Sequence, residues 1–483
     1  MKNNLLKLVS GSLIMAGCSV YRDAGGDRPN IVFIVVDDLG WSDLGCYGAD
    51  LHETPHIDRL ASKGVLFTNS YSAAPVRSPT RASIMTGKYP ARLNFTIWSE
   101  AASVAERKNQ EIYRFLPPQT IESLPLEEIT LAEKLKEKGY LTAHIGKWHL
   151  GDLMHFPESQ GFDVGFAASQ RGAPPSYFYP YKGEAFGEYR FVTDMGTDAG
   201  GSYFTDRKGE YLTDRLTDEA MKIMEDAGSQ PFYLNLWYYN VHTPIQAKAN
   251  DIEYFKTKII PGIHHQNETY ASMVKAVDDN VGRLLKKLGD LRISHKTVVI
   301  LISDNGGYIN EYKGKTVTSN YPLRSGKGSL YEGGIRIPTI ITYPDGNYPC
   351  RKTDVPVSTV DFFPTILEIT GIDALSGIDG RSFLQVLKGI PDSTLMNRPL
   401  FWHYPHYYPT TTPVSAIRKG NWKLLEYLED GRTELFDLSA DQGESRNLAG
   451  KEPQIANELL QTLRDWRIRA GAKGITINPE FRQ

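Results

Sequence analysis

The sequence predicts an α/β fold with a large, mostly parallel central sheet flanked by helices, followed by a smaller C-terminal α+β domain. Continuous apolar, β-branched segments such as 30–36 and 296–303 are typical of strands buried on both faces of a parallel sheet, and they alternate with amphipathic segments of helical length. After residue 396 the pattern changes to short strands separated by turns and closed by one helix. The 483 residues are enough for two such domains.

The first domain is expected to span 28–385. Its strands are expected at 30–36, 140–145, 232–239, 296–303 and 336–341. Its helices are expected at 56–64, 78–86, 130–139, 216–227, 270–288 and 360–367. Ser78 and Pro79 predict a cap and a first helical position, and Thr130 with Glu133 predicts a capping box. Segment 152–212 is rich in Gly, Pro, Tyr and Phe and predicts long loops over the functional face.

The second domain is expected to span 396–483, after a boundary region at 371–397 with Gly, Pro, Asp and Ser punctuation. Strands are expected at 399–404, 415–418, 422–427 and 433–437, and a closing helix at 452–470. His403 and His406 stand in an aromatic run. Contact with a ligand and a purely structural cluster are both open for them.

The N-terminus resembles an export signal. Lys2 and Lys7 precede an apolar run at 8–16 that is too short to span a bilayer. Met15-Ala16-Gly17-Cys18 resembles a bacterial lipobox, so residues 1–18 are expected to be a lipoprotein signal peptide and Cys18 to carry lipid. The protein is then exported, at the periplasm or cell surface, and meets a membrane only through a lipid anchor. A plain secreted protein is the alternative.

Charge and cysteine content exclude some classes of function. A net charge of −3 gives no basis for nucleic-acid binding. Cys46 and Cys350 remain in the mature chain without zinc-ligand spacing. We expect them to be small buried apolar residues, and the sequence leaves open whether they pair.

Polar residues follow several predicted strands. Asp37 and Asp38 end the first strand, and Asp304 and Asn305 end the strand at 296–303. Strand ends are where open α/β sheets bind ligands, and oxygen-only ligands favour a hard divalent cation. An acidic pair by itself is equally well a loop cap.

A second set of residues suits an anion. The start of the helix near Arg77 and Arg81 offers free N–H groups and partial positive charge. Lys147 and His149 follow the strand at 140–145 and would point the same way in extended chain. One can neutralise an anion and the other can donate to it.

The sequence RSPTRASIMTG at 77–87 resembles the signature of the type I sulfatases. That pattern reads Cys or Ser, any residue, Pro, any residue, Arg, with Thr-Gly a few residues later; Pro79, Arg81 and Thr86-Gly87 match it. GKWHLG at 146–151 matches a second motif of the family. The resemblance implies an alkaline-phosphatase-like fold and a formylglycine nucleophile made from the first signature residue. In this chain that residue is Arg77.

The resemblance also implies roles for the other residues. Asp37, Asp38, Asp304 and Asn305 would hold a cation, calcium rather than magnesium. Arg81, Lys147, His149 and Lys327 would hold the sulfate. His242, which precedes Thr-Pro at the end of the strand at 232–239, would protonate the leaving oxygen.

The expected function is therefore that of a sulfuric ester hydrolase. The substrate would be a sulfated carbohydrate of the galactose or N-acetylgalactosamine type, or an aryl sulfate ester. We expect impaired turnover because the Arg77 guanidinium stays protonated and is no nucleophile. Two alternatives stay open: a pseudo-sulfatase that binds sulfated glycans without cleaving them, and a phosphodiesterase-like relative, against which the single-cation set argues.

Overall fold

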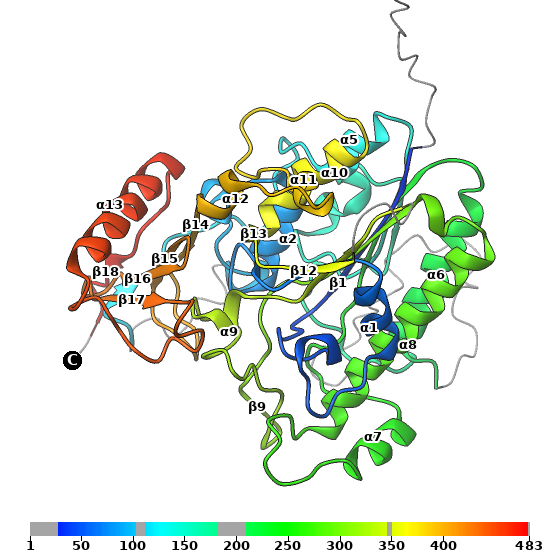
Figure 1. Cartoon of the computed structure of the whole chain (residues 1–483), viewed down its shortest axis with the longest axis horizontal. Helices are drawn as coiled ribbons and strands as arrows, with labels where there is room; N and C mark the ends of the chain where they lie inside the picture. Colours follow the sequence, from blue (N-terminus) through cyan, green and yellow to red (C-terminus); the bar gives the residue numbers. More distant parts are fainter. Residues whose placement is uncertain (1–27, 103–111, 182–208, 345–349, 482–483) are drawn as a thin grey trace, which may run out of the picture.

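The computed structural model describes residues 28–102, 112–181, 209–344 and 350–481 (Figure 1). Its centre is an eight-stranded sheet in the order β12-β2-β11-β8-β1-β7-β5-β6. Strands β8, β1, β7, β5 and β6 are parallel, whereas β11 is antiparallel to both of its neighbours. The strands are β1 (Asn30–Val36), β2 (Val65–Phe67), β5 (Leu141–Gly146), β6 (Val164–Phe166), β7 (Phe232–Trp237), β8 (Thr297–Ser303), β11 (Thr339–Thr342) and β12 (Arg351–Thr353). The predicted mostly parallel sheet is confirmed.

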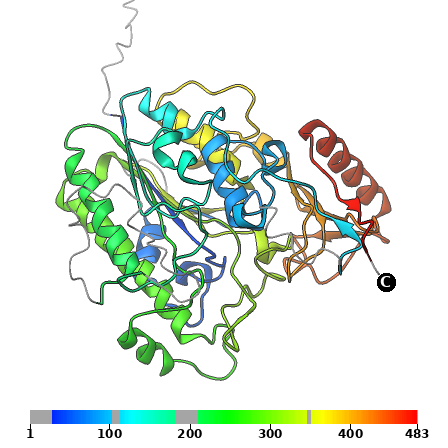
Figure 2. The same cartoon turned by 180° about the vertical axis from the view of Figure 1, so that it is seen from behind.

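Helices cover both faces of this sheet (Figures 1 and 2). One side carries α1 (Pro55–Ser62), α6 (Leu212–Asp226), α7 (Ala249–Lys256) and α8 (Glu268–Asp290). The other carries α2 (Arg77–Thr86), α5 (Leu131–Lys136), α10 (Phe362–Ile369), α11 (Leu384–Leu387) and α12 (Ser393–Asn397).

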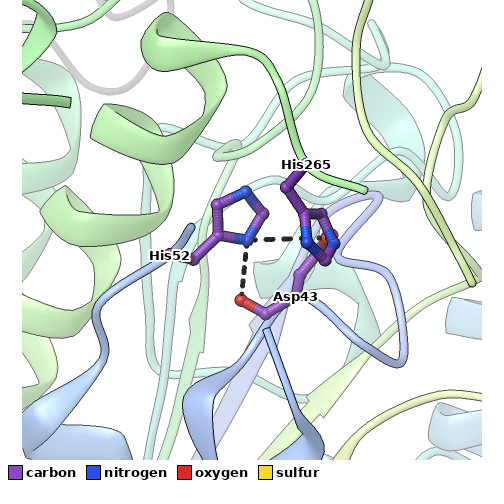
Figure 3. A group of neighbouring side chains, drawn as sticks. All are labelled: Asp43, His52 and His265. Carbon is purple, nitrogen blue, oxygen red and sulfur yellow. Dashed lines mark hydrogen bonds and ion pairs between the residues drawn. The ribbon is translucent and has the colours of Figure 1, made fainter. Parts of the chain in front are cut away.

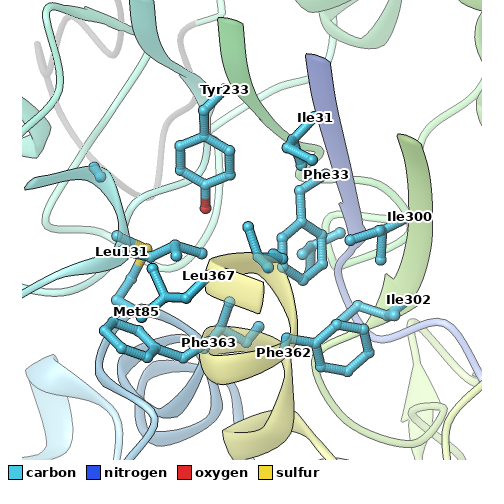
Figure 4. Close-up of a cluster of buried hydrophobic side chains, with 14 of the residues drawn as sticks. Ile31, Phe33, Met85, Leu131, Tyr233, Ile300, Ile302, Phe362, Phe363 and Leu367 are labelled. Atoms are coloured by element: carbon cyan, nitrogen blue, oxygen red, sulfur yellow. The ribbon is translucent and has the colours of Figure 1, made fainter. Parts of the chain in front are cut away.

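Strand β1 shows why its sequence is apolar throughout. Val32 and Ile34 belong to the core beneath α6 and α8, and Ile31 and Phe33 to the core beneath α2 and α10. Figure 4 shows the second core, where Phe362 and its neighbours on α10 lie against β1 and β8. A strand buried on both faces has no polar side to alternate with.

The short elements complete the first domain. Strands β3 (Ser70–Tyr71) and β13 (Val357–Ser358) pair, as do β9 (Glu311–Tyr312) and β10 (Lys315–Thr316). Short helices are η1 (Gly45–Tyr47), α3 (Pro90–Leu93), α4 (Ser99–Ala102), η4 (Leu153–His155), η5 (Pro157–Gln160), η7 (Ser294–Lys296), α9 (Glu332–Ile335) and η8 (Thr359–Asp361).

Two local predictions were tested by these elements. The capping box of α5 is confirmed, because Glu133 N–H donates to Thr130 Oγ1 at 3.2 Å and Thr130 N–H to Glu133 Oε2 at 2.7 Å. The cap at Ser78 was wrong: the helix begins two residues earlier, with extended Val76 as the cap and Arg77 as the first helical residue, and Ser78 Oγ is buried without a hydrogen-bond partner in the described chain. The same pattern of Ser before Pro suits the first turn as well as the cap.

Segment 152–212 is only partly a loop. It contributes β6 at the edge of the sheet, where Val164 pairs with Ala143 and Phe166 with Ile145. Three residues are too few to show a strand period, so the sequence did not reveal this strand. Residues 182–208 of the segment lie outside the described residues.

The second domain is a four-stranded antiparallel sheet with one long helix. Its strands are β14 (Pro399–Tyr404), β15 (Val414–Lys419), β16 (Trp422–Tyr427) and β17 (Thr433–Asp437), and α13 (Pro453–Ala470) covers one face. Trp466 of α13 stacks on Phe401 at 4.7 Å. A short β18 (Thr476–Ile477) returns to pair with β4 (Phe115–Leu116) of the first domain.

The other face of the small sheet packs against the first domain. Trp402 and Leu425 share a core with Val76, which precedes α2, with Leu330, which precedes α9, and with Ile335, the last residue of α9. Side chains of α11 and α12 still belong to the core beneath α2 and α10, so the chain crosses into the second domain just before Pro399. The second domain therefore supports two segments that carry predicted site residues.

The predictions about the N-terminus, the cysteines and membrane spans have different outcomes. The predicted signal peptide, with Cys18, lies outside the described residues. Cys46 and Cys350 are free; Cys46 is half-buried, but Cys350 is exposed, contrary to the expectation of burial. Among the described helices, none is both long and apolar enough to cross a bilayer.

Candidate active site

Four oxygen-bearing side chains meet at the carboxyl edge of the sheet. Strands β1 and β8 are parallel neighbours with Val36 opposite Ser303, so Asp37, Asp38, Asp304 and Asn305 follow at the same level. Carboxylate oxygens of the three aspartates lie within 4.8 Å of one another, and all three are buried. The structure thus brings the predicted cation ligands together.

The donor set suits a hard cation. Asp37 Oδ1 and Asn305 Oδ1 are buried and have no hydrogen-bond partner among the described residues. Burial raises the pKa of the Asp37 carboxyl to about 7, with the charge of Lys147 opposing the shift and the charges of Asp304 and Asp38 adding to it. A divalent cation would take up the free oxygens and favour the ionised form of Asp37.

Three of the positively charged side chains that were predicted to hold sulfate each pair with one aspartate. Arg81 donates to Asp304 Oδ2 from Nε at 2.9 Å and from Nη2 at 2.7 Å. Lys147 Nζ binds Asp37 Oδ2, and Lys327 Nζ binds Asp38 Oδ2 at 2.5 Å. Burial lowers the pKa of Lys147 to about 7, although Asp37 opposes the shift.

Gly146 explains how Lys147 reaches this place. Its φ is +102°, and a Cβ on it would run into the carbonyl oxygen of Trp237 on the next strand. Only glycine allows β5 to end so close to β7. The following backbone turns Lys147 toward Asp37 while Trp148 enters the core.

Arg77, the first residue of α2, reaches into the same region. Its Nη1 donates to Nε2 of His242, and its guanidinium lies 5.9 Å from the ring of Trp98. His242 Nδ1 lies 2.7 Å from the carbonyl oxygen of Thr243, so Nδ1 carries the proton and Nε2 accepts. Burial, with the charges of Lys327, Arg77 and Lys147, holds the pKa of His242 well below its usual value. His242 is therefore a neutral imidazole whose Nε2 is taken by Arg77.

His149 lies beside Arg77 and has a partner that sequence reasoning missed. Its Nε2 lies 2.5 Å from Glu100 Oε2, on α4. A single acidic residue in a polar stretch carries no signal of such a contact.

A second missed group supports the loop after β1 (Figure 3). Asp43 Oδ2 accepts from Gly40 N–H at 2.6 Å and from the hydroxyl of Tyr270 at 2.5 Å. His265 Nε2 lies 3.3 Å from Asp43 Oδ1, and its Nδ1 lies 2.6 Å from Asp50 Oδ1. Both ring nitrogens of His265 face oxygen acceptors, which fits an imidazolium rather than a metal ligand.

The two histidines of the second domain are tied to other parts of the chain. His403 uses both ring nitrogens, with Ser415 Oγ at 2.8 Å and the carbonyl oxygen of Lys473 at 2.8 Å. His406 Nε2 lies 2.8 Å from Thr96 Oγ1. For His403 these contacts favour the structural alternative.

The family model named Sulfatase matches residues 29–372, most of the chain. The chain belongs to the sulfatase family. It is a type I sulfatase by family, on the alkaline phosphatase superfamily fold. A second model, N-sulphoglucosamine sulphohydrolase, C-terminal, matches residues 326–469. Sulfatases generally bind a divalent metal, which agrees with the acidic group at the sheet edge.

Individual sulfatases resemble this chain along most of its length. It is 31% identical to N-acetylgalactosamine-6-sulfatase of Canis lupus familiaris over 450 residues, covering 91% of this chain and 79% of the relative. It is 29% identical to a sulfatase of Formosa agariphila, covering 95% and 92%. The crystal structure of Ps i-CgsB in complex with k-i-k-neocarrahexaose superimposes with a TM-score of 0.73 at 29% identity, covering 91% and 93%.

Proposed function

We propose that this sulfatase is a sulfuric ester hydrolase for sulfated carbohydrate, and that Arg77 impairs its turnover. The substrate class is supported by the similarity to an N-acetylgalactosamine-6-sulfatase and to Ps i-CgsB, whose structure contains a neocarrahexaose. Galactose and N-acetylgalactosamine sulfates are accordingly the substrates to test first. For location we propose a lipoprotein anchored at Cys18, on the basis of Met15 to Cys18.

The positions of the charged groups support the roles that the family resemblance implies for them. Asp37, Asp38, Asp304 and Asn305 would hold calcium, which would supply a fixed positive charge for the sulfate oxygens. That ion would neutralise the acids in place of their protein partners. Arg81, Lys147 and Lys327 would then have N–H groups to offer a sulfate. Without the contact from Arg77, His242 would take up a proton at Nε2 and deliver it from there to the leaving oxygen.

The contact between Arg77 and His242 carries the second half of the proposal. Arg77 occupies the place where the family signature has Cys or Ser, and arginine cannot become formylglycine. Its Nη1 also donates to Nε2 of His242, the atom from which we propose that the proton leaves. Arg77 thus removes the nucleophile and occupies the acid.

A pseudo-sulfatase that binds sulfated glycans is the second candidate. One observation favours it: Arg77, Arg81, Lys147 and Lys327 all act electrostatically on the same acids, so four cations surround the site. Arginine binds sulfate-like anions through two parallel hydrogen bonds. In this candidate function, the additional arginine helps to bind the sulfated glycan, and the sulfate ester is not cleaved.

Sulfate release from a panel of sulfated sugars tests the proposal. The chain would be compared with Arg77→Cys and Arg77→Ser, each produced with a formylglycine-generating enzyme, and with Arg92→Ser as a surface control. We expect turnover only from the two Arg77 replacements. Robust release by protein confirmed to carry Arg77 contradicts the impairment, and binding of sulfated sugars without release by any variant supports the pseudo-sulfatase.

A further inference from the structure

His149 is held in an unusual way for a residue with a functional assignment. It is fully buried, its φ is +59°, and its N–H donates to the carbonyl oxygen of Ser169 at 3.0 Å. A left-handed conformation at a residue other than glycine is strained and persists where surrounding contacts impose it. The contact of its Nε2 with Glu100 Oε2 at 2.5 Å is one of those contacts.

The partners of Glu100 decide which nitrogen of His149 carries the proton. Glu100 Oε1 accepts from Gly172 N–H at 2.7 Å. Burial opposes ionisation, but the hydrogen bonds with His149 and Gly172 N–H, together with the charge of Arg77, hold the pKa of Glu100 far below its usual range. An ionised carboxylate can only accept, so Nε2 of His149 must carry a hydrogen.

His149 is also neutral near pH 7. Burial lowers its pKa to about 4, although Glu100 raises it and the cations Arg77 and Lys147 lower it further. A neutral imidazole with a hydrogen on Nε2 has a lone pair on Nδ1. In this state His149 has no hydrogen on Nδ1 to donate to a sulfate oxygen.

Nδ1 faces the side chain at position 77. It is buried and has no hydrogen-bond partner in the part of the chain that the structure describes, and the same is true of Arg77 Nε. The place that a Cβ on Gly172 would occupy lies 2.9 Å from His149 Nδ1 and 2.8 Å from Arg77 Nε. Both unpartnered atoms therefore border one small space, which glycine at 172 leaves open.

We propose that Glu100 is a positioning residue that fixes His149 as the tautomer with hydrogen on Nε2 and so presents Nδ1 as an acceptor toward residue 77. For its catalytic consequence this rests on the proposed function, because a hydroxyl-bearing group at position 77 would be the donor. Glu100 suits this role because it lies between the buried imidazole and the solvent. Of its side chain 30% is exposed, whereas none of the His149 side chain is. It lines a polar cavity of about 270 Å³ together with Glu122, Asp152 and Arg171.

The tautomer can be measured without any activity. In protein labelled with ¹⁵N-histidine, and with the His149 signals assigned through His149→Asn, we expect a hydrogen on Nε2 and none on Nδ1 between pH 6 and 8. A glutamine at position 100 offers one acceptor for two donors, Gly172 N–H and the imidazole. We therefore expect Glu100→Gln to shift His149 toward the tautomer with hydrogen on Nδ1.

Glu122→Gln is the matched control, because Glu122 lines the same cavity and has no hydrogen bond to His149. It should leave the His149 signals unchanged. Hydrogen on Nδ1 in the unmodified chain overturns the proposal even if Glu100→Gln fails to fold. So does a folded Glu100→Gln protein with the tautomer unchanged.

An activity measurement separates this proposal from the proposed function. In the Arg77→Cys background with formylglycine, Glu100→Gln should lower kcat by about 10- to 100-fold, the effect of losing a hydrogen-bond partner that orients a functional histidine. KM should change little, since Glu100 does not contact the proposed sulfate site. If no Arg77 replacement turns over but the tautomer responds to Glu100, the proposed function fails and this assignment stands. If sulfate is released and kcat is unchanged by Glu100→Gln, the positioning role of Glu100 is contradicted while the proposed function stands.

Discussion

At the scale of single residues, the site is a balance of buried charges. Arg81, Lys147 and Lys327 each bind one aspartate of the acidic group. Arg77 is the cation left over, and its Nη1 contacts a neutral imidazole instead. The protein cations compete with a metal ion for the carboxylates, because each buried charge needs a partner. For the same reason the carboxylates compete with a sulfate for the protein cations. The acids and the cations of this site are therefore set to exchange partners when ligands bind.

Replacing Arg77 should strengthen calcium binding. The charges of Asp37 and Asp38 raise the pKa of Arg77 against the effect of burial, so the guanidinium lies within their electrostatic reach and repels a second cation there. We expect Arg77→Ser to lower the calcium Kd at least about tenfold, or about 1.4 kcal/mol, by titration calorimetry on chelator-treated protein. Arg92→Ser, which removes a surface ion pair with Asp379, should leave Kd unchanged. Equal calcium affinity with and without Arg77 would contradict the repulsion.

At the scale of elements, the loop after β1 is held by contacts with α8 and with the segments around it. Tyr270 at the start of α8 donates to Asp43 Oδ2 at 2.5 Å and lies 3.3 Å from the carbonyl oxygen of Asp38. Thr318 donates to Asp43 Oδ1 at 2.7 Å. Asp43 thus collects donors from three segments and holds the backbone next to the cation ligands. Such supporting contacts orient ligands that would otherwise move independently.

His265 should make stability depend on pH in alkaline solution. Burial lowers its pKa, but hydrogen bonds and charges from Asp43 and Asp50 raise it to about 9, from 6.5. A raised pKa stabilises the fold fully below pH 6.5, and the contribution is lost as pH rises through 9. The pKa of Asp43 is lowered to about 2, and that of His52 to about 4, so neither changes charge in this window. The upper bound of the contribution is about 3 kcal/mol.

Urea unfolding at pH 6 and at pH 9.5 measures this dependence. The deficit of His265→Gln relative to the unmodified chain should be large at pH 6 and smaller at pH 9.5. His295→Gln, at an exposed position in η7, should show no such change. A deficit that is the same at both values would mean that His265 acts through packing and not through its charge.

At the scale of the whole molecule, a buried ion cluster joins the two domains. Lys423 Nζ, on β16, lies 2.8 Å from Glu332 Oε1 on α9 and 2.9 Å from Glu444 Oε1 in the second domain. No part of these three side chains is exposed. The segment that leads into α9 also carries Lys327, so the second domain stabilises one of the site cations from behind. The apolar contacts of Trp402 and Leu425 with Val76 act on the start of α2 in the same way.

Removing Lys423 should loosen this junction. Lys423→Met leaves Glu444 buried without its cation and Glu332 with the longer ion pair to Arg336 at 3.5 Å, which costs about 3–5 kcal/mol. Lys419→Met on β15 is the matched control, because it breaks only an exposed ion pair with Glu458 and should cost at most about 1 kcal/mol. Thermal unfolding of the two variants measures the difference. Similar melting temperatures for both would show that the cluster adds little to the docking of the domains.

The sequence by itself determined the elements and the membership of the charged site. Buried strands such as β1 and β8 were predicted because apolar periodicity is a local property, and the acids that follow them were predicted because parallel strands end at one edge. The sheet, its flanking helices and the family were predicted from these patterns and from the signature at 77–87. Single short elements such as β6, and the cap at Ser78, escaped local reasoning because several local structures suit the same few residues.

Only the tertiary structure decided which side chains face each other. The contacts Arg77–His242, Glu100–His149 and Asp43–His265 each join residues from distant parts of the chain. A hydrogen bond requires two atoms to lie within about 3 Å, and that distance is set by the packing of whole elements rather than by any local pattern. These contacts, in turn, set the protonation states and charge pairs on which the chemistry of the site depends.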